Sequence, residues 1–315
     1  MGRPMATSQD FVNWVCSEDI DYRYLKYVLV SERDSFLSFA SGTTHQTIYF
    51  PEVKAFHICL PPRDEQKTIV EILSSLDEKI ELNRKQNRTL EAIAQALFKH
   101  WFVDFEFPDE NGRPYKSSSG AMQPSELGKI PVGWKVGRFK DEFNINMGQS
   151  PSGDSYNETG DGLVFFQGRT DFGFRYPEIR MYCTEPKKRA QKGDILLSVR
   201  APVGDLNIAA ETCCIGRGLA AVSSDHQSYA FHKLKYCRPL LDVFESEGTV
   251  FGSISKSGFE NIQTVVPNTR IRQRFESVVA DLDDKIELAT TQNTTLASLR
   301  DTLLPKLMSG ELRVT

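Results

Sequence analysis

The stretch from Arg63 to about Phe105 constrains this chain of 315 residues more than any other part of it. It contains no proline or glycine, and apolar residues recur at spacings of four and three, which is the period of a coiled-coil helix. At 1.5 Å per residue such a helix is roughly 60 Å long, so it needs a second long helix along its apolar seam. The seam consists of Ile69, Leu73, Leu76, Ile80, Asn83, Asn87, Leu90, Ala94, Leu97 and Trp101.

The same pattern occurs again 206 residues further along the chain. Ten of the fifteen residues from Leu76 to Leu90 are identical at that offset, including Lys79 and Gln86, which a helix would expose to solvent. Because exposed helix positions are free to vary, these identities indicate an internal duplication. The second seam consists of Phe275, Val279, Leu282, Ile286, Ala289, Asn293, Leu296, Arg300, Leu303 and Leu307.

The residues ahead of each long helix repeat as well. Pro61 corresponds to Pro267, residues 42–43 to 248–249, and residues 25–27 to 234–236 with a shift of three positions. The first copy aligns with the second only from about Ala210 onward. It therefore lacks roughly 80 residues of the repeated unit. We therefore expect an incomplete module at 1–60, a helix at 61–107, a linker at 108–126, a complete module at 127–267 and a second helix with a tail at 268–315.

Apolar runs and turn residues predict the elements of the two modules. In the first module we expect strands at 11–15, 47–50 and 55–60 and helices at 22–30 and 35–40. In the second we expect a mixed α/β domain, with helices at 228–238 and 240–246 and strands at 163–167, 180–183, 195–199, 206–209 and 218–222.

Composition excludes several classes of protein. No apolar run approaches a membrane span and no signal peptide is recognisable, which favours a cytoplasmic protein. The six cysteines lack metal-ligand spacing, so we expect buried free thiols. A net charge of −4 means that any nucleic-acid site must be a local patch.

No pattern of catalytic residues is present. The glycine-rich run at 252–258 has the wrong order for a phosphate-binding loop, and no histidine has a nucleophile or a zinc partner at a recognisable spacing. The acidic groups at 77–78 and 283–284 resemble fragments of a nuclease metal site, but a solvated helix face is the favoured interpretation. We expect neither an enzyme, nor a metal site, nor a bound cofactor.

Polar loops of the second module suggest nucleic-acid binding instead. Arginine fits the edge of guanine, glutamine fits adenine, and lysine or serine holds phosphate. Arg200 follows an apolar strand on a stiff turn, Gln149 lies in a Gly- and Pro-rich turn, and Arg217 lies between two glycines. Any one of them is equally well a surface charge without a role, so the hypothesis rests on the set. The loops also carry Arg175 and residues 187–189, and the predicted DNA-binding residues are Gln149, Arg169, Arg200, Arg217, Ser253 and Lys256.

Two asparagines occupy equivalent seam positions in the two long helices, at Asn87 and Asn293. A buried asparagine lowers the stability of a coil but favours the one alignment that satisfies its amide. We predict that both residues help to determine how the helices align. The seam residues assigned to this contact are Leu76, Ile80, Asn87, Leu90, Leu282, Ile286, Asn293 and Leu296.

These features together resemble the specificity subunit of type I restriction-modification systems. Residues 96–108, ALFKHWFVDFEFP, look like the end of that family's central conserved region, and residues 303–312, LLPKLMSGEL, look like its distal one. Residues 193–198, GDILLS, are similar to a strand of its target-recognition domains. The resemblance covers nearly the whole chain.

The resemblance implies an α/β (α+β) target-recognition domain and two long helices that form an antiparallel coiled coil. It implies that each recognition domain reads one half of a split double-stranded DNA sequence and that the helices set the gap. The helices would dock methyltransferase subunits and, through them, the restriction (translocase) subunit. S-adenosylmethionine would bind to those partners.

The chain departs from the family in its incomplete first recognition domain. That piece is a remnant, or the chain associates with a second copy or another specificity chain; alternatively, residues 8–60 fold against the coil and contact the DNA backbone. Our hypothesis is that this chain recognises one half-site. The alternative from another class is a non-catalytic coiled-coil scaffold whose α/β module binds protein or saccharide, and an enzyme with an unrecognised site would require activity from the chain alone.

Overall fold

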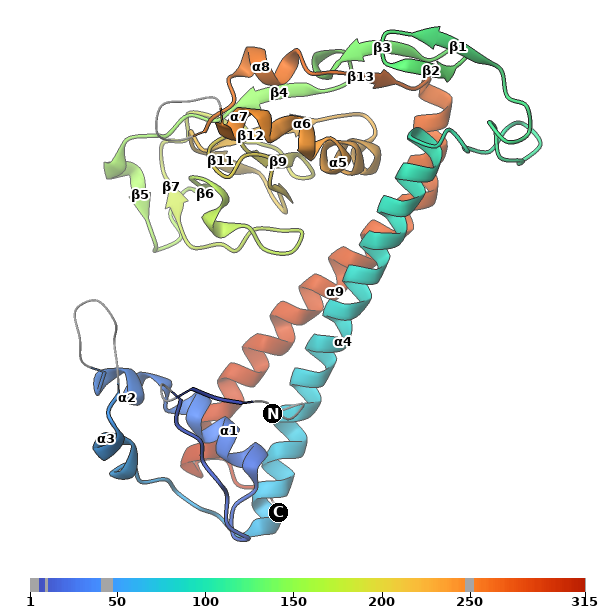
Figure 1. Ribbon diagram of the computed structural model, residues 1–315. Helices are drawn as coiled ribbons and strands as arrows, with labels where there is room; N and C mark the ends of the chain where they lie inside the picture. Colours follow the sequence, from blue (N-terminus) through green and yellow to red (C-terminus); the bar gives the residue numbers. More distant parts are fainter. Residues whose placement is uncertain (1–5, 9–10, 41–47, 247–251, 315) are drawn as a thin grey trace. The chain divides into compact units, whose positions relative to one another are not determined.

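The computed structural model describes residues 6–8, 11–40, 48–246 and 252–314. The chain forms two compact units, which we call unit 1 (Met1–Arg88 with Ile286–Thr315) and unit 2 (Thr89–Lys285). Two long helices, α4 (Arg63–Phe102) and α9 (Thr269–Ser309), run from one unit into the other (Figure 1). Each unit therefore contains a part of each long helix.

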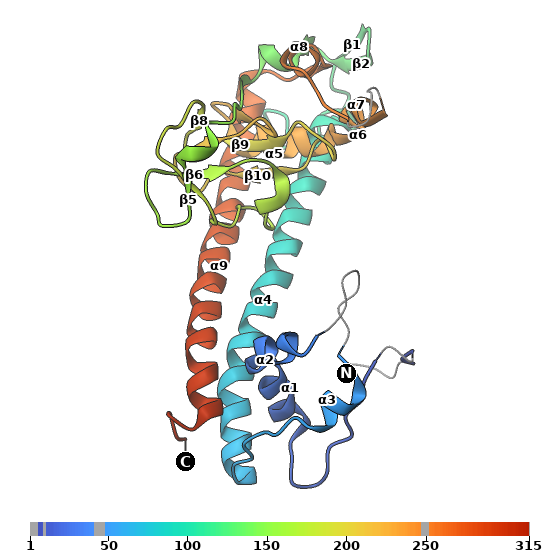
Figure 2. The same ribbon diagram turned by 90° about the vertical axis from the view of Figure 1, so that its left-hand side faces the viewer.

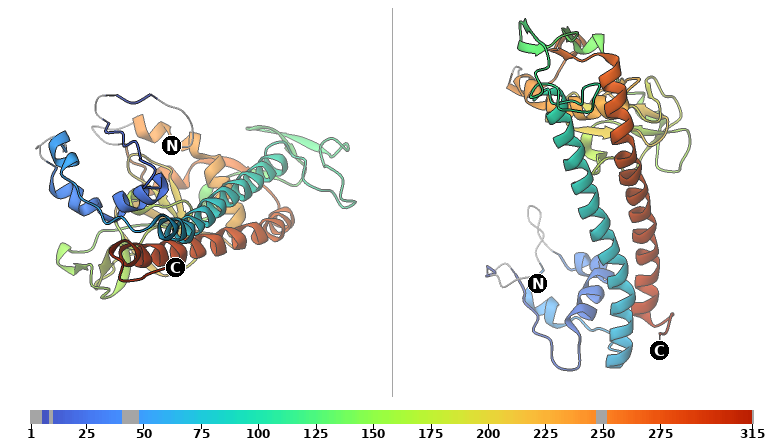
Figure 3. Two further views of the ribbon diagram at one scale, coloured as in Figure 1. Left: turned by 90° about the horizontal axis from the view of Figure 1, so that it is seen from below. Right: turned by 90° about the vertical axis from the view of Figure 1, so that its right-hand side faces the viewer.

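The long helices pair antiparallel in each unit (Figures 2 and 3). In unit 1 Asp77 forms an ion pair with Arg300, and Asn83 bonds Asn293. In unit 2 the rings of Phe98 and Phe275 are 5.9 Å apart. Residue numbers rise along α4 as those of its partners fall along α9, and every predicted seam residue is buried or half-buried. The predicted antiparallel coiled coil is confirmed.

The charges at the ends of α4 fit its direction. Asp64 and Glu65 lie in its first turn, and Lys99 and His100 lie in its last. Acidic groups near the N-terminus and basic groups near the C-terminus complement the helix dipole. Two prolines precede the helix, and it ends at Phe102, five residues before the end of the expected segment 61–107.

In the described residues of the first module, in unit 1, the regular elements are three helices. Asp21 caps the first helix by accepting a hydrogen bond from the Arg23 amide at 2.8 Å. That helix packs Tyr24 and Tyr27 against α4 and α9, where the cluster also contains Ile69, Val70, Leu73, Leu304 and Leu307. The helices are α1 (Tyr22–Ser31), α2 (Arg33–Ser38) and α3 (Phe50–Lys54).

The strands predicted for the first module are wrong in the described residues. Residues 11–15 and 55–60 have no regular structure, and α3 begins at Phe50, where the strand at 47–50 was expected. Residue 47 and the repeated pairs at 42–43 and 248–249 lie outside the described residues. Short apolar runs become strands only beside a partner strand, and no strand is present among the described residues of this module.

Unit 2 contains two sheets and two short ribbons. One sheet is antiparallel with the order β10-β9-β12-β4, and the other has the order β5-β7-β6-β11-β8, in which β6 and β11 are parallel. Its strands are β4 (Asn144–Met147), β5 (Tyr156–Asn157), β6 (Leu163–Phe166), β7 (Tyr182–Cys183), β8 (Arg189–Ala190), β9 (Ile195–Ser198), β10 (Leu206–Ile208), β11 (Cys213–Ile215) and β12 (Leu219–Ser223). All five strands predicted from the sequence are present, with small shifts at their ends.

The helices of unit 2 cover the antiparallel sheet and reach the long helices. The cluster that joins them contains Phe98 and Trp101 of α4, Phe275 of α9 and Tyr229. The predicted helix at 228–238 is confirmed, and the one at 240–246 consists of two short helices. The helices are α5 (Gln227–Tyr236), α6 (Arg238–Leu241), α7 (Val243–Ser246) and α8 (Lys256–Glu260), with single turns η1 (Phe139–Asp141), η2 (Gly153–Ser155) and η3 (Arg169–Asp171).

The two ribbons lie at the chain ends of the recognition module. Strand β1 (Met122–Ser125) pairs with β2 (Gly128–Pro131), and β3 (Lys135–Arg138) pairs with β13 (Gln263–Val266). The end of the expected linker is thus a β-hairpin whose turn contains Leu127. Phe107, just before that linker, stacks on Tyr115 and Trp134 and is part of the unit 2 core.

The sequence repeat reappears in the packing. Ile69 and Leu73 of α4 lie in the unit 1 cluster with Leu304 of α9. Their repeat counterparts Phe275 and Val279 lie in the unit 2 cluster with Phe98, the counterpart of Leu304. In each unit a short helix, α1 or α5, packs on this group. Equivalent residues therefore make equivalent contacts in the two units, as a duplication requires.

Candidate nucleic-acid interface

Five loops of unit 2 meet at one edge of its two sheets. Strands β4 and β9 end there and β12 begins there, because both flank β12 antiparallel to it. The parallel strands β6 and β11 also end at this edge. We call the loops at residues 148–153, 167–169, 199–204, 216–218 and 252–255 the five-loop edge.

Main-chain hydrogen bonds tie these loops together. The Gln149 amide donates to the Ile215 carbonyl at 3.0 Å, and the Val199 amide donates to the Gly218 carbonyl at 2.9 Å. The Ala201 amide donates to Gly252 at 2.9 Å, next to a β-bridge between Arg200 and Ser253. The predicted residues Gln149, Arg200, Arg217 and Ser253 therefore lie on neighbouring loops, although more than 100 residues separate the first from the last.

Glycines let the loops approach this closely. A Cβ at Gly148 would lie 2.2 Å from the Gly216 carbonyl oxygen, and one at Gly218 would lie 2.6 Å from the Gln167 carbonyl oxygen. A side chain at either position would force the loops apart. The glycines beside Gln149 and Arg217 thus hold the loops in contact, while the polar residues next to them face outward.

The side chains at the edge are exposed and suited to hydrogen bonding. Gln149, Arg200, Arg217 and Ser253 are all exposed. Within the part of the chain that the structure describes, neither Arg200 nor Arg217 forms an ion pair. Ser150 is held in place, because its hydroxyl bonds the Gln167 amide at 2.9 Å and accepts the Arg217 main-chain amide at 3.2 Å. The edge therefore presents uncompensated positive charge on a braced main chain.

The other two predicted residues lie differently. Arg169 turns toward Asp205 and forms an ion pair with it at 2.6 Å. Lys256 begins α8, three residues beyond Ser253, and pairs with Glu260 at 3.5 Å. Both side chains are exposed, and both have a carboxylate partner, which Arg200 and Arg217 lack among the described residues.

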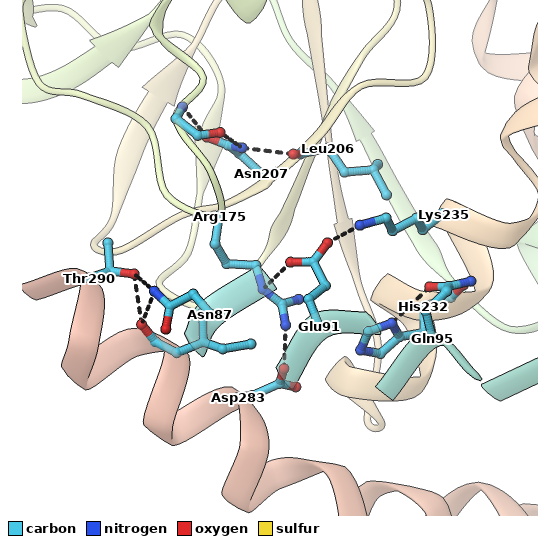
Figure 4. A network of polar contacts seen from close by, with 12 residues as sticks. Asn87, Glu91, Gln95, Arg175, Leu206, Asn207, His232, Lys235, Asp283 and Thr290 are labelled. Carbon is cyan, nitrogen blue, oxygen red and sulfur yellow. Dashed lines mark hydrogen bonds and ion pairs between the residues drawn. The ribbon is translucent and has the colours of Figure 1, made fainter. Parts of the chain in front are cut away.

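Arg175 is buried, unlike the other loop arginines. Its side chain is 1 % exposed and forms ion pairs with Asp283 of α9 and Glu91 of α4 (Figure 4). The guanidinium also lies over the Phe231 ring, 4.0 Å from the ring centroid. Burial lowers the pKa of its guanidinium, and the charge of Asp283 opposes that shift. Arg175, which is not among the predicted DNA-binding residues, thus anchors the recognition module to both long helices.

Further polar contacts join α5 to the long helices of unit 2. Glu276 of α9 accepts the amides of Ser228 and Tyr229 at 2.9 and 3.1 Å, which satisfies the N-terminus of α5. Lys235 pairs with Glu91. A carboxylate of α9 therefore caps the N-terminus of a helix in the recognition module. The sequence pattern did not predict this contact.

His232 lies at the centre of this contact. Its Nδ1 is 3.0 Å from the Gln95 Oε1, and the Gln95 amide nitrogen donates to the His232 carbonyl (Figure 4). Since the amide oxygen must accept, Nδ1 carries a proton, and the buried Nε2 has no hydrogen-bond partner, which disfavours a second proton on the ring. Burial, with the charge of Arg175, lowers the pKa of His232 to about 3.

In each acidic group of the long helices one residue is ion-paired, Asp77 or Asp283, while the other, Glu78 or Asp284, is exposed. Asp77 accepts from Lys26 at 2.9 Å, Tyr27 at 2.8 Å and Arg300 at 2.9 Å, which lowers the pKa of its carboxyl despite burial. Asp283 is the partner of Arg175. The expectation of solvated positions is wrong for these two residues, because basic side chains of the modules reach them. No group of three metal-ligating side chains occurs among the described residues.

The seam asparagines bond across the helix pair in unit 1. Asn83 donates to Gln292 at 2.8 Å and to Asn293 at 2.9 Å, and Asn87 donates to Thr290 at 3.2 Å. The two predicted residues, Asn87 and Asn293, thus have separate partners on the opposite helix. The sequence pattern did not single out Asn83, which is buried and lies at the centre of this group.

Comparison with known proteins identifies the family. Residues 2–92 and 131–298 match the family described as the type I restriction modification DNA specificity domain. The chain belongs to this family. It is a type I restriction-modification specificity subunit, which serves DNA target recognition and is not itself an enzyme.

Two specificity subunits of Methanocaldococcus jannaschii are similar along nearly the whole chain. The MjaX subunit is 33% identical over 304 residues, which cover 94% of this chain and 69% of the relative. The MjaIX subunit is 29% identical over 332 residues, which cover 99% of this chain and 74% of the relative. The chain thus spans about seven-tenths of the length of these relatives.

A solved structure shows the same fold. The type I restriction-modification S subunit from M. genitalium superimposes with a TM-score of 0.58 at 19% identity, covering 94% of this chain and 74% of that one. None of the helices in the described ranges is long and apolar enough to span a membrane.

Proposed function

We propose that the recognition module, residues 127–267, reads one half of a split DNA sequence through the five-loop edge. The observation that carries this proposal is the meeting of Gln149, Arg200 and Arg217 on loops that are distant in sequence. Arginine matches the acceptor pair of guanine, and glutamine matches the donor and acceptor of adenine. A braced main chain with exposed polar tips suits the reading of base edges, because little conformational freedom is lost on binding.

The helix pair is the second part of the proposed function. Its antiparallel alignment sets the position of the recognition module, which Arg175 and Glu276 attach to it within unit 2. Outer faces of α4 and α9 would dock methyltransferase subunits and, through them, the restriction subunit. The names of the relatives, all specificity subunits of type I restriction enzymes, support this assignment.

The chain alone is proposed to specify one half-site. In the described residues of unit 1 the first module contains helices α1 to α3 and no strand, so it offers no counterpart of the five-loop edge. A second reading surface would then come from another specificity chain or from a second copy of this one. With this chain as the only specificity subunit, two different, fully specified half-sites in a methylation map would contradict the proposal.

Arg200 and Arg217 provide the direct test. The full chain is expressed with its modification subunit in a host lacking other methylation, and methylated sites are mapped genome-wide. Arg200→Ala and Arg217→Ala should each relax base preference at one position, while Lys256→Ala should weaken methylation of all sites alike. Equal loss at every site for both arginine variants would reduce them to phosphate contacts.

Salt dependence separates DNA recognition from a scaffold that binds protein or saccharide. The affinity of the assembled complex for duplex DNA should fall steeply as salt rises, with a slope set by the phosphates contacted. Binding that responds weakly to salt and does not distinguish sequences would favour the scaffold.

A further inference from the structure

A cavity of about 320 Å³ lies in unit 2 at the base of two loops of the five-loop edge. Arg169, which lines it, directly follows Gly168 of one loop, and Asp205 follows Gly204 of another. Its remaining lining comes from aromatic residues at 172, 174 and 231, from Gly173, Leu206 and Asn207, and from the charged residues Glu91, Lys235 and Arg238.

Asp205 holds two guanidinium groups at this cavity. Its Oδ2 is 2.6 Å from Arg169 and its Oδ1 is 2.9 Å from Arg238. Both arginine side chains remain about half exposed, at 45% and 48%. In each ion pair the shortest contact uses one terminal nitrogen of the guanidinium, and each group has five N–H donors. Donors on both arginines therefore remain for a ligand.

The charges at the cavity do not cancel. Lys235, 42% exposed, is the third cation, and its partner Glu91 also faces the buried Arg175. Asp205 is shared by Arg169 and Arg238. Asp205 and Glu91 are thus the carboxylate partners of four cations at or behind the cavity wall: Arg169, Arg238, Lys235 and Arg175. Asp283 is a further partner of Arg175. The excess positive charge and the forked donors suit an oxyanion, above all a phosphate.

The main chain fixes the position of Asp205 relative to Arg200. Ser198 donates its amide to the Asp205 carbonyl at 2.9 Å, and the Asp205 amide donates to the Ser198 hydroxyl at 2.9 Å. These bonds close the loop at 199–204, on which Arg200 lies at the five-loop edge. A Cβ at Gly204 would lie 3.1 Å from the Leu241 Cδ1 and 3.4 Å from the Arg238 Cγ, so a glycine here lets α6 approach the loop.

We propose that Arg169 and Arg238, positioned by Asp205, bind a backbone phosphate of the DNA strand whose base Arg200 contacts. A phosphate contact beside a base contact fixes register, because base reading needs a defined position of the strand. This inference rests on the proposed function and adds to it a phosphate site, two residues for which the sequence offered no signal, Asp205 and Arg238, and a role for Arg169.

The test compares Arg238→Ala, Arg238→Lys and Arg169→Ala in the full chain assembled with its modification subunit. Affinity is measured over a range of salt for one duplex selected by the wild type and for a pool of random duplexes. Arg238→Ala and Arg169→Ala should each reduce the slope of log affinity against log salt by about 0.9 and weaken both DNAs by the same factor. Arg238→Lys should retain the slope, because it keeps the charge.

Arg113→Ala is the matched control. Arg113 is also exposed and also pairs with one carboxylate, Asp109, but it lies on the 108–126 segment, away from the cavity lining. Its removal should leave the slope unchanged. Circular dichroism of each variant establishes that the fold is retained before binding is compared.

The possible results distinguish failure of the phosphate site from failure of the proposed DNA-recognition function. A steep wild-type slope that Arg238→Ala and Arg169→Ala leave intact overturns the phosphate site alone. So does a change of base preference at one position in Arg238→Ala, since that would make Arg238 a base-reading residue. A wild-type complex whose binding is insensitive to salt and sequence instead overturns the proposed function on which the site depends.

Discussion

Arg175 shows how one side chain can carry the contact between a recognition module and its helical support. The guanidinium is desolvated, and its charge is balanced by Glu91 and Asp283 on the two long helices. A buried charge is tolerated only with such partners, and removing one partner leaves the others uncompensated. The arrangement is therefore sensitive to the loss of any member.

We predict that Arg175→Met lowers the free energy of unfolding by about 3–5 kcal/mol, because two carboxylates lose their buried counter-ion. Urea unfolding followed by circular dichroism measures the change. Arg180→Met is the control, since Arg180 is half exposed and pairs with Asp171, and a surface ion pair contributes at most about 1 kcal/mol. Similar losses in both variants would contradict an anchoring role for Arg175.

His232 makes the same contact sensitive to pH. Its pKa is about 3 in the folded chain and about 6.5 when unfolded, so the unfolded state binds more protons between these values. Stability is complete above pH 6.5 and decreases as the pH falls toward 3. We expect this residue to lower stability by about 2 kcal/mol at pH 5 relative to neutral pH.

His232→Asn should remove that part of the pH dependence, because asparagine can donate to Gln95 and does not titrate. The measurement is the free energy of unfolding of both proteins from pH 7 to pH 4.5. Parallel curves for the variant and the wild type would show that His232 is not held neutral.

The sequence did not predict which loop arginines are buried or ion-paired and which are exposed. Arg169, Arg175 and Arg200 all occur in polar loops of the second module, and the sequence offers no way to distinguish them. Their environments differ because carboxylates from other elements reach two of them: Asp205 reaches Arg169, and Asp283 reaches Arg175. Such partners are set by tertiary packing, which residue type and local spacing do not encode.

At the scale of elements, the long helices were predictable and the ribbons were not. A heptad pattern sustained over 40 residues indicates a coiled-coil helix, and the duplicated copy of the pattern is the second helix of the pair. Strands β1 and β2 each contain a proline, at Pro124 and Pro131, and such residues argue against a strand unless it is short or at an edge. Both strands are short and form an isolated hairpin, which is the exception.

Asn83 is predicted to determine how the two long helices align. Its amide bonds Gln292 and Asn293, so the present alignment is the one that satisfies this buried group. We expect Asn83→Leu to keep or raise the thermal stability of the coil and to broaden the distribution of alignments. A buried leucine packs against several registers with similar energy, whereas the amide requires a partner.

Spin labels at Gln86 and Thr291, which are exposed on opposite helices of unit 1, measure that distribution as a set of distances. The background carries serine at Cys16 and Cys59 so that only the labelled sites react. Arg88→Leu, an exposed change on the same helix, is the control. An unchanged, narrow distance distribution in Asn83→Leu would remove the alignment role from this residue.

At the scale of the whole molecule, cysteine environments differ between the two units. Cys16 and Cys59 of unit 1 are accessible, and the remaining four lie buried in unit 2: Cys183, Cys213, Cys214 and Cys237. Burial raises the pKa of Cys213 and Cys214 to about 12 and that of Cys237 to about 11. Thiolate, the reactive form, is therefore scarce at these three cysteines at neutral pH.

We predict that a thiol reagent at pH 8 modifies two cysteines rapidly and the other four only as unit 2 unfolds. Mass spectrometry of samples taken over time identifies the sites. Adding urea below the unfolding midpoint should accelerate the slow phase and leave the fast phase unchanged. Rapid reaction of any of the four buried thiols in the absence of urea would show that unit 2 opens locally.

The main-chain bonding of the five-loop edge has a consequence for how a new target sequence can arise. Loops joined through amides, carbonyls and glycines keep their arrangement when an outward side chain is replaced. Changing Arg200 or Arg217 should thus alter which base is preferred without cost to folding, whereas any residue other than glycine at 148 or 218 should disrupt the surface. Under the proposed function, a single substitution at one of these exposed groups would then redirect which DNA sites the partner subunits act on.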